Sequence, residues 1–401
     1  MPHADGAALA RARGGPVSWR KVLVTGATGF IGSRLCEMLA LDYRIPYRAL
    51  VRNYSRAARI ARLDAELVPG DMLDVASLKR ALDGCDAVVN LAHADDRSAA
   101  RQVGNLVDAA RHAGVRRFVH VSSMAVHGPA PTVAVVDESA PIRRWHEAYS
   151  DAKVAGEAVI AAAVRQHGFP AVILRPTIVY GPYSFFVTPI IDDARDGRIS
   201  LVDGGRGVCN AVYVDDVCDA IVAGLQEDRA VGGAFLVNGD DPVDWHTFIH
   251  AFADLVDRPK RTDDHAVDAI RDHWRRERSI SRGNLGASAR LLASPDFHAQ
   301  LSRVPAVGAL LRGTKRLAAM ALDDDRKRAL KQRLRGRPSP FADAHAPAVR
   351  MPGEGRVVRE AYRARVANDL ARLQLGWTPR HRFGRGVERT GDWLRFARLV
   401  D

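Results

Sequence analysis

The stretch Thr25-Gly26-Ala27-Thr28-Gly29-Phe30-Ile31-Gly32 decides the fold of this chain. It follows a short apolar run, residues 21–25, that has the length and composition of a buried strand. Beyond it, apolar residues recur at helical spacing over residues 31–41. A strand that passes into a helix through three glycines is typical of the first unit of a doubly wound parallel sheet.

The same alternation of apolar runs and helical segments continues along the chain. Further strands are predicted at residues 48–51, 66–68, 87–91, 117–122, 171–174 and 234–237. Strands of this length, separated by helices, indicate a parallel sheet covered by helices on both faces. We therefore predict an α/β chain with a Rossmann-type doubly wound parallel sheet and a smaller C-terminal substrate-binding domain.

The three glycines have separate physical tasks. Gly26 permits a tight turn, Gly29 lets the backbone approach a pyrophosphate, and Gly32 lets the helix pack closely on the sheet. The N-terminus of the following helix offers unpaired N–H groups and a partial positive charge to phosphates. Because a strand precedes the loop and a helix follows it, the loop predicts a dinucleotide site.

The end of the second strand bears on which dinucleotide binds. A carboxylate there would bind the ribose hydroxyls of NAD, whereas an arginine would favour the 2′-phosphate of NADP. The sequence has Arg52 there and Arg56 nearby, so NADP is favoured modestly over NAD. A solvated arginine is the alternative. Asp71, after the third strand, is expected either to bind the adenine amine or to cap the next helix.

Tyr149 and Lys153 stand one helical turn apart. Tyrosine has an ordinary pKa of roughly 10, and a nearby ammonium group is expected to lower it for acid–base catalysis. Serines end the fifth strand, and a hydroxyl there can hold a substrate oxygen beside the tyrosine. Either feature alone would fit an ordinary amphipathic helix or an ordinary turn.

Several motifs together carry a family resemblance. They are TGATGFIG (25–32), GDMLD (70–74), NLAH (90–93), VSSMAVHG (121–128), YSDAK (149–153), LRPTIVYGP (174–182) and YVDDVCDAI (213–221). Their order and spacing resemble the extended short-chain dehydrogenases, the NAD-dependent epimerase/dehydratase family. The resemblance covers about residues 20–255, and residues 235–252 and 375–383 resemble later segments of that family.

The resemblance implies a role for each matching residue. Ser123 would orient the substrate, Tyr149 would be the acid–base, and Lys153 would bind the nicotinamide ribose and tune the tyrosine. The residues predicted to bind the cofactor are Gly26, Thr28, Gly29, Phe30, Ile31, Gly32, Arg52, Asp71, Met72, Leu91, Ala92, Tyr149, Lys153, Pro176, Thr177 and Val179. The residues predicted to face the substrate are Ser123, His127 and Asn210, with His127 alternatively a packing residue. No metal site is predicted, because His127 has no second ligand near it in sequence.

Departures from the family pattern affect the choice of substrate. Arg52 replaces the acid that sugar-nucleotide epimerases usually carry. Cys209 and Asn210 occupy the place where many of them have an arginine that grips the diphosphate, unless Arg206 or the basic segment substitutes. The loop over residues 91–105 is short and lacks a clear counterpart of the family's asparagine.

The predicted domain organisation follows from these motifs. Residues 1–18 form a disordered leader, and residues 19–180 form the NAD(P)-binding Rossmann domain, to which residues 211–240 return. Residues 181–401 form mainly the substrate-side domain, with a basic helical insertion at about 260–350.

Charge and cysteine usage bear on partners and location. Of the formal net charge of +12, a net +10 lies within residues 260–340, which carry 19 Lys/Arg and 9 Asp/Glu. Helical spacing at 310–322 indicates a solvated lid helix, a cap on a substrate pocket, or contact with an anionic membrane. Nucleic acid is not expected as a partner, since aromatic residues make up 6% and no binding module appears. Four scattered cysteines, no signal peptide and no long apolar run indicate a cytoplasmic protein.

The function expected from the sequence is hydride transfer at a secondary alcohol or ketone of a small molecule. The leading reading is an epimerase or dehydratase acting on a sugar or sugar nucleotide. The alternative is a net NADPH-dependent ketone reductase or hydroxysteroid-type dehydrogenase, favoured by Arg52 and the missing diphosphate arginine. A non-catalytic cofactor-sensing protein is disfavoured by the intact Ser123, Tyr149 and Lys153. A homodimer would be the habit of the family.

Overall fold

The structure is a computed structural model that describes residues 18–93, 95–129, 133–283 and 351–400. The predicted leader, apart from Ser18, lies outside these residues, as does most of the predicted basic insertion, including the stretch 310–322. The chain divides into two compact units: Met1–Asp264 with Gly355–Asp401, and His265–Glu354. We call these the first and the second unit.

The first unit is built on a seven-stranded sheet whose neighbouring strands all pair in parallel, in the order β11-β7-β5-β4-β1-β2-β3. The strands are β1 (Val22–Thr25), β2 (Tyr47–Val51), β3 (Glu66–Pro69), β4 (Ala87–Asn90), β5 (Arg117–Val121), β7 (Ala171–Pro176) and β11 (Ala234–Val237). Every predicted strand is present, with its ends within two residues of the prediction. The predicted Rossmann-type fold is confirmed.

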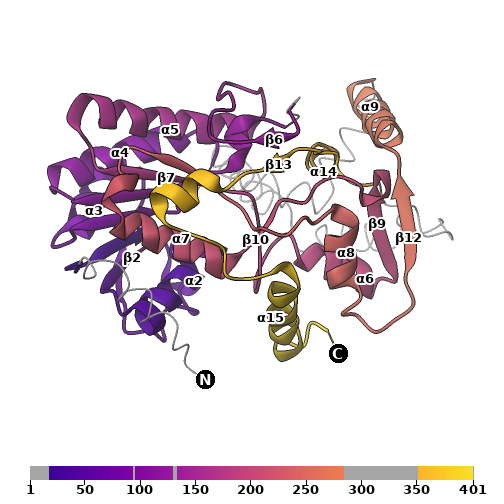
Figure 1. Cartoon of the computed structure of the whole chain (residues 1–401), viewed down its shortest axis with the longest axis horizontal. Helices are drawn as coiled ribbons and strands as arrows, with labels where there is room; N and C mark the ends of the chain where they lie inside the picture. The colour runs from indigo at the N-terminus through magenta and orange to yellow at the C-terminus, as the bar shows by residue number, and fades with distance from the viewer. Residues whose placement is uncertain (1–17, 94, 130–132, 284–350, 401) are drawn as a thin grey trace, which may run out of the picture. The chain divides into compact units, whose positions relative to one another are not determined.

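Helices cover both faces of this sheet (Figure 1). They are α2 (Phe30–Met38), α3 (Val75–Leu82), α4 (Ala99–His112), α5 (Ala148–His167) and α7 (Val214–Gln226). Alternate strand residues enter different cores, because successive side chains of a strand point to opposite faces. Leu23 and Phe118 pack with α3, α4 and α5, whereas Val24 and Val119 pack with α2 and α7. Both faces are therefore apolar, which explains the continuous apolar runs in the sequence.

Smaller elements extend the first unit on the substrate side. They are the strands β6 (Val135–Val136), β8 (Ile178–Tyr180), β9 (Arg198–Val202), β10 (Ala211–Tyr213), β12 (Arg261–His265) and β13 (Arg365–Val366), and the helices α6 (Thr188–Arg195), α8 (Trp245–Ala253) and α15 (Phe383–Phe396). The helix α14 (Glu354–Glu360) begins at the last residue of the second unit. Aromatic residues Tyr180, Phe248 and Phe383 pack together at the centre of this part.

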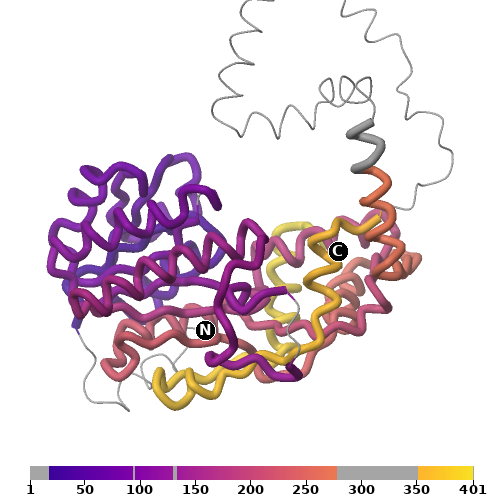
Figure 2. The backbone as a smooth tube through the Cα atoms, turned by 90° about the horizontal axis from the view of Figure 1, so that it is seen from above, coloured from indigo at the N-terminus to yellow at the C-terminus, as the bar shows by residue number. Residues whose placement is uncertain are grey.

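The C-terminal segment of the chain returns to the body of the first unit, as its yellow course in Figure 2 shows. Its strand β13 pairs in parallel with β6, so that Val366 lies opposite Val136. Trp377 donates from its indole nitrogen to the backbone oxygen of Asp216 at 2.9 Å. The last 47 residues are thus part of the same compact body as the dinucleotide fold.

The described part of the second unit consists mainly of α9 (Val267–Gly283). Its Trp274 donates to the backbone oxygen of Pro352 at 2.8 Å. Among the described residues of the whole chain, none of the helices has both the length and the apolar character needed to cross a membrane.

Candidate active site

The glycine loop has the geometry that a bound pyrophosphate requires. Gly26 has a φ of +68°, and a Cβ atom there would lie 2.7 Å from the carbonyl carbon of Leu91. A Cβ on Gly32 would lie 2.1 Å from the backbone oxygen of Gly26, so the close contact between helix and loop excludes any side chain. Helix α2 starts after Gly29 without a side-chain cap, which leaves its first N–H groups free for phosphate oxygens. The residues present therefore fit a dinucleotide.

The remaining predicted cofactor residues follow successive strands of the sheet at its carboxyl edge. Asp71 and Met72 follow β3, Leu91 and Ala92 follow β4, and Pro176 ends β7. Asp71 accepts from the backbone N–H of Leu73 at 2.8 Å. It does not cap α3, so the alternative interpretation of Asp71 as a helix cap is wrong: that position is Asp74, which accepts from Ala76 and Ser77.

Asn105 is a residue that the sequence reasoning missed. It stands in α4 and donates to the backbone oxygen of Met72 at 3.1 Å. The bond ties the loop after β3 to the helix that follows β4, and so fixes the edge where an adenine would lie. A partner 33 residues away in the chain gives no local signal in the sequence.

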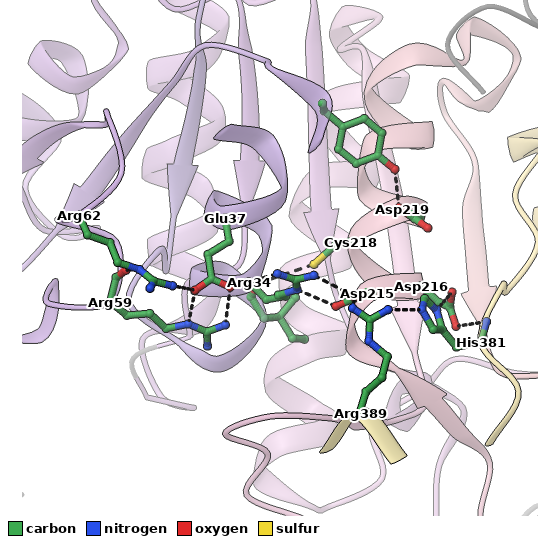
Figure 3. A network of polar contacts seen from close by, with 12 residues as sticks. Arg34, Glu37, Arg59, Arg62, Asp215, Asp216, Cys218, Asp219, His381 and Arg389 are labelled. Carbon is green, nitrogen blue, oxygen red and sulfur yellow. Dashed lines mark hydrogen bonds and ion pairs between the residues drawn. The ribbon is translucent and has the colours of Figure 1, made fainter. Parts of the chain in front are cut away.

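Arg52 and Arg56 are exposed and make no ion pair or side-chain hydrogen bond within the described residues. Neighbouring arginines behave differently: Arg59 and Arg62, in the loop after β2, converge on Glu37 of α2 (Figure 3). Glu37 is 6% exposed; burial acts to raise its pKa, but hydrogen bonds and ion pairs with Arg59 and Arg34 outweigh this and lower it. The loop is thus held by other arginines, which leaves Arg52 available at the end of β2.

The same network continues from α2 to α7. Arg34 donates to both carboxylate oxygens of Asp215 at 2.7 and 2.9 Å, and Arg389 of α15 approaches Asp215 at 3.6 Å (Figure 3). Asp216 binds His381 at 2.9 Å. These bonds fix the glycine-loop helix against the segment that follows β10.

The structure places Ser123, Tyr149 and Lys153, the predicted catalytic residues, close to one another. The Ser123 hydroxyl begins η3 (Met124–His127) by accepting from Ala125 N–H at 3.2 Å, and its interaction with the Tyr149 hydroxyl acts to lower the pKa of that tyrosine. Tyr149 lies in the first turn of α5, which Glu147 caps, and it is 38% exposed. Lys153 is buried, donates to the backbone oxygen of Val121 at 3.1 Å, and lies 5.8 Å from the Tyr149 ring centroid.

The predicted lowering of the tyrosine pKa is not found. Loss of solvent around the hydroxyl raises the pKa of Tyr149, and the hydrogen bond with Ser123 offsets part of this rise. Burial lowers the pKa of Lys153 to about 8, against the opposing effects of Glu157 and Asp96. The ammonium group is directed at the Val121 carbonyl, which explains why it does not stabilise a Tyr149 phenolate here.

His93 and Asp96 complete the surroundings of Tyr149, and the sequence did not single them out. His93 Nε2 lies 2.9 Å from Asp96 Oδ1, and the imidazole ring stands edge-on to the Tyr149 ring. Burial and the charge of Lys153 lower the pKa of His93. The motif that contains His93 was recognised, but nothing local indicated that its side chain would lie against a tyrosine 56 positions later.

Trp145 anchors the loop that leads into α5. Its indole nitrogen donates to Val126 O at 2.8 Å, and its backbone N–H donates to Asp151 at 2.6 Å. A Cβ on Gly128, which has a φ of +89°, would lie 2.6 Å from the indole ring. The glycine of the VSSMAVHG motif is therefore required by the packing of Trp145.

The two predicted substrate residues outside the catalytic set have their polar atoms engaged within the protein. His127 is buried, contacts the Ala140 backbone oxygen through Nδ1 at 3.0 Å, and receives Arg175 at Nε2 at 3.3 Å. Burial and Arg175 lower its pKa. These contacts favour the packing interpretation of His127.

Asn210 connects β10 to the returning C-terminal segment. Its side chain donates to Ala364 O at 3.0 Å and accepts from Val366 N–H at 2.8 Å. The preceding Cys209 is 1% exposed. Arg206, considered as a substitute for a diphosphate arginine, is paired with Asp203. A substrate contact by Asn210 would require it to give up bonds that hold β13 in place.

Comparisons with known proteins agree with this geometry. The family model of the NAD dependent epimerase/dehydratase family matches residues 22–237. The chain is 32% identical to a 4-hydroxy-2-methyl-3-oxo-4-farnesyl-3,4-dihydroquinoline-1-oxide ketoreductase of Stigmatella aurantiaca, over 57% of this chain and 71% of the relative. It is 29% identical to a dTDP-glucose 4,6-dehydratase of Streptomyces niveus, over 55% of this chain and 72% of the relative.

Among solved structures, the chain is similar to a UDP-glucuronic acid 4-epimerase from Bacillus cereus in complex with UDP-glucuronic acid and NAD. The TM-score is 0.63 and the identity 16%, with 94% of this chain and 99% of that chain covered. At this identity the likeness concerns the fold alone. The family match spans more than half of the 401 residues. The chain therefore belongs to the NAD-dependent epimerase/dehydratase family of enzymes.

Proposed function

We propose that this enzyme is a net NADPH-dependent ketone reductase or hydroxyl dehydrogenase for a small molecule that is not a sugar nucleotide. The proposal rests on the absence of a cationic side chain at positions 209 and 210, where the family's diphosphate arginine would stand. Cysteine and asparagine occupy these two positions. Cys209 is buried, and the Asn210 amide is committed to Ala364 and Val366. Neither side chain offers a positive charge to a diphosphate.

The proposed roles follow from the positions of the side chains. The hydroxyls of Ser123 and Tyr149, which interact with each other, can both donate to a substrate carbonyl oxygen that takes a place between them. Tyr149 then gives its proton to that oxygen as the carbonyl becomes an alcohol. The glycine loop, Lys153 and the edge residues Leu91, Ala92, Pro176 and Thr177 would hold the dinucleotide, which would supply the hydride when bound.

The preference for NADP rests on Arg52. It is exposed, directly follows β2, and has no competing carboxylate among the described residues, so a 2′-phosphate can recruit it without breaking a bond. The first relative described above is a ketoreductase, which supports reduction as the net reaction.

A second candidate is an epimerase or dehydratase acting on a sugar nucleotide. It is favoured by the relative named a dTDP-glucose 4,6-dehydratase, and by Arg206 and Arg363, which share the single carboxylate of Asp203. Two guanidinium groups on one carboxylate leave one positive charge that a diphosphate could use.

The test begins with mass spectrometry of any nucleotide that co-purifies, followed by titration with NADPH and NADH. We expect exchangeable NADPH, an affinity for NADPH about tenfold lower in Arg52→Ala, and no change in Arg165→Ala, an exposed arginine of α5. Net NADPH consumption with a panel of β-keto esters and cyclic ketones would support reduction. Tightly retained NAD, with conversion of a sugar nucleotide and no net cofactor turnover, would overturn it.

A further inference from the structure

The ring of Tyr149 receives little support from the helix that carries it. Tyr149 is the second residue of α5 and is 38% exposed. A side chain inside a helix lies over the turn that precedes it, but at this position no such turn exists. Proton transfer requires a fixed donor, since a displacement of about 1 Å can slow a reaction roughly 100-fold. Residues outside the first turn of α5 must therefore hold the ring.

Two side chains border the ring of Tyr149. The ammonium nitrogen of Lys153 lies 5.8 Å from its centroid, but Lys153 belongs to α5 as well and donates to the Val121 carbonyl. The imidazole ring of His93 stands edge-on to the tyrosine, with the two centroids 5.4 Å apart, a favourable arrangement for two aromatic rings. His93 thus connects the ring of Tyr149 to a different segment, the loop after β4.

The orientation of His93 is itself fixed by neighbouring side chains. Its Nε2 atom lies 2.9 Å from Asp96 Oδ1, and because a carboxylate only accepts hydrogen bonds, Nε2 carries the proton. The adjacent Asp95 accepts from the Ser98 N–H at 2.9 Å and from Gln102 at 3.4 Å. Gln102 is a buried residue of α4. The loop that presents His93 is therefore attached to the start of α4.

Titratable groups from three parts of the chain act on His93. Burial and the charge of Lys153 on α5 lower the pKa of His93, against the opposing effects of Asp96 and Asp95 on its own loop. His120 on β5 also lies near and stays neutral until the pH approaches 3. The imidazole is therefore neutral at neutral pH, and it packs on Tyr149 without adding a second cation beside Lys153.

We propose that His93, oriented by Asp96, is a positioning residue that holds the ring of Tyr149 for proton transfer. The imidazole would restrict the movement of the ring and so keep the hydroxyl beside Ser123. During reduction the proton passes from the Tyr149 hydroxyl to the carbonyl oxygen, and the phenolate regains a proton from water. His93 itself gives up no proton. The inference rests on the proposed function, because it takes Tyr149 as the proton donor.

A first experiment tests the contact between the two rings without any substrate. The full-length protein is prepared with ¹³C-labelled tyrosine, and Tyr149→Phe identifies the signal of Tyr149 among the eight tyrosines by its loss. As the pH is lowered, we expect this signal to shift in a step with a midpoint below 6.5, when His93 gains a proton. The step should vanish in His93→Phe and remain in His167→Phe, which replaces an exposed histidine of the same helix. A missing step in the unmodified protein, or one that persists in His93→Phe, would overturn the proposal.

A second experiment measures the reduction of ethyl acetoacetate by NADPH. We expect His93→Ala to lower kcat about tenfold or more and to leave the affinity for NADPH unchanged, because His93 holds the tyrosine and not the dinucleotide. His93→Phe retains a ring against Tyr149 and should keep kcat within about threefold of the unmodified enzyme. His167→Ala is the control and should change neither quantity.

The two experiments separate a failure of this inference from a failure of the proposed function. Full kcat in His93→Ala, or an equal loss of kcat in the alanine and phenylalanine variants, would exclude a positioning role for the ring of His93. If the unmodified protein reduces no ketone, the proposed function fails, and the NMR titration alone then decides whether His93 contacts Tyr149. The titration step in the unmodified protein also remains decisive if a His93 variant does not fold.

Discussion

The imidazole ring of His93 lies edge-on to the ring of Tyr149, with the ring centroids 5.4 Å apart and the planes inclined by 78°. Asp96 binds the Nε2 atom of that imidazole at 2.9 Å. Its negative charge also contributes to raising the pKa values of both Tyr149 and Lys153. A short loop after β4 thus places a carboxylate where it influences both Tyr149 and Lys153.

Replacing Asp96 by asparagine should lower the pKa of Lys153 below its value of about 8, because the carboxylate favours the charged ammonium group. The chain has few lysines, so Lys153 can be followed by NMR titration of ¹³C-labelled lysine, and Lys153→Arg assigns its signal. Asp95→Asn is the matched control, since Asp95 belongs to the same loop but bonds to Ser98. Equal pKa values of Lys153 in the two variants would contradict an influence of Asp96.

The buried ion pair behind the active site should be essential for stability. Glu157 and Arg175 are joined by bonds of 3.0 and 2.7 Å, and both side chains are at most 7% exposed. Glu157→Gln leaves a buried guanidinium group without its counter-charge, which should lower the free energy of unfolding by about 3–5 kcal/mol. Urea denaturation measures this change. The exposed pair of Arg385 and Glu388 provides the control, for which Glu388→Gln should leave the free energy of unfolding almost unchanged.

The strands, the glycine loop and the family motifs could be predicted from the sequence, because each depends on a local pattern of residues. Short apolar runs predicted all seven strands of the main sheet, most of which are buried on both faces, whereas β3 is half-exposed. The three glycines predicted the dinucleotide loop, and at Gly26 and Gly32 the close backbone contacts leave no room for a Cβ atom. The family motifs predicted that Ser123, Tyr149 and Lys153 act at one site.

The hydrogen bonds between distant segments could not be predicted, because they depend on how the chain folds back on itself. The bond between Arg34 and Asp215 joins residues 181 positions apart, and that between Asn210 and Ala364 joins residues 154 apart. The sequence predicts a substrate contact for Asn210 because Asn210 stands at the place of the family's diphosphate arginine. In the structure, the side chain of Asn210 hydrogen-bonds the Ala364 backbone oxygen and the Val366 N–H of the returning C-terminal segment.

Gly32→Ala should greatly weaken dinucleotide binding. The new Cβ would lie 2.1 Å from the Gly26 oxygen and would push α2 away from the loop that cradles the pyrophosphate. We expect the affinity for NADPH, measured by fluorescence titration, to fall at least about tenfold. Gly384→Ala is the control, because no atom lies within 4 Å of the added carbon. Unchanged binding by the Gly32 variant would exclude the glycine loop as the cofactor site.

His120 should make the protein sensitive to acid. It is 2% exposed, its Nδ1 atom bonds the Asn90 side chain at 3.0 Å, and burial lowers its pKa from 6.5 to about 3. Below pH 6.5, His120 binds a proton in the unfolded chain but stays neutral in the folded protein until the pH approaches 3. Stability is therefore complete above pH 6.5 and falls as the pH decreases toward 3. Between pH 6.5 and 5 the loss from this one group should be about 1–2 kcal/mol.

The slope of stability against pH, obtained from urea denaturation at several pH values, tests this prediction. His120→Phe lowers the stability at every pH because Asn90 loses its partner, but it should flatten the slope between pH 6.5 and 5. His112→Gln alters an exposed histidine and should leave the slope as it is. If the slope of the His120 variant matches that of the unmodified protein, His120 takes up its proton in the folded state as readily as in the unfolded one. The buried polar contact between β4 and β5 would then be open to solvent.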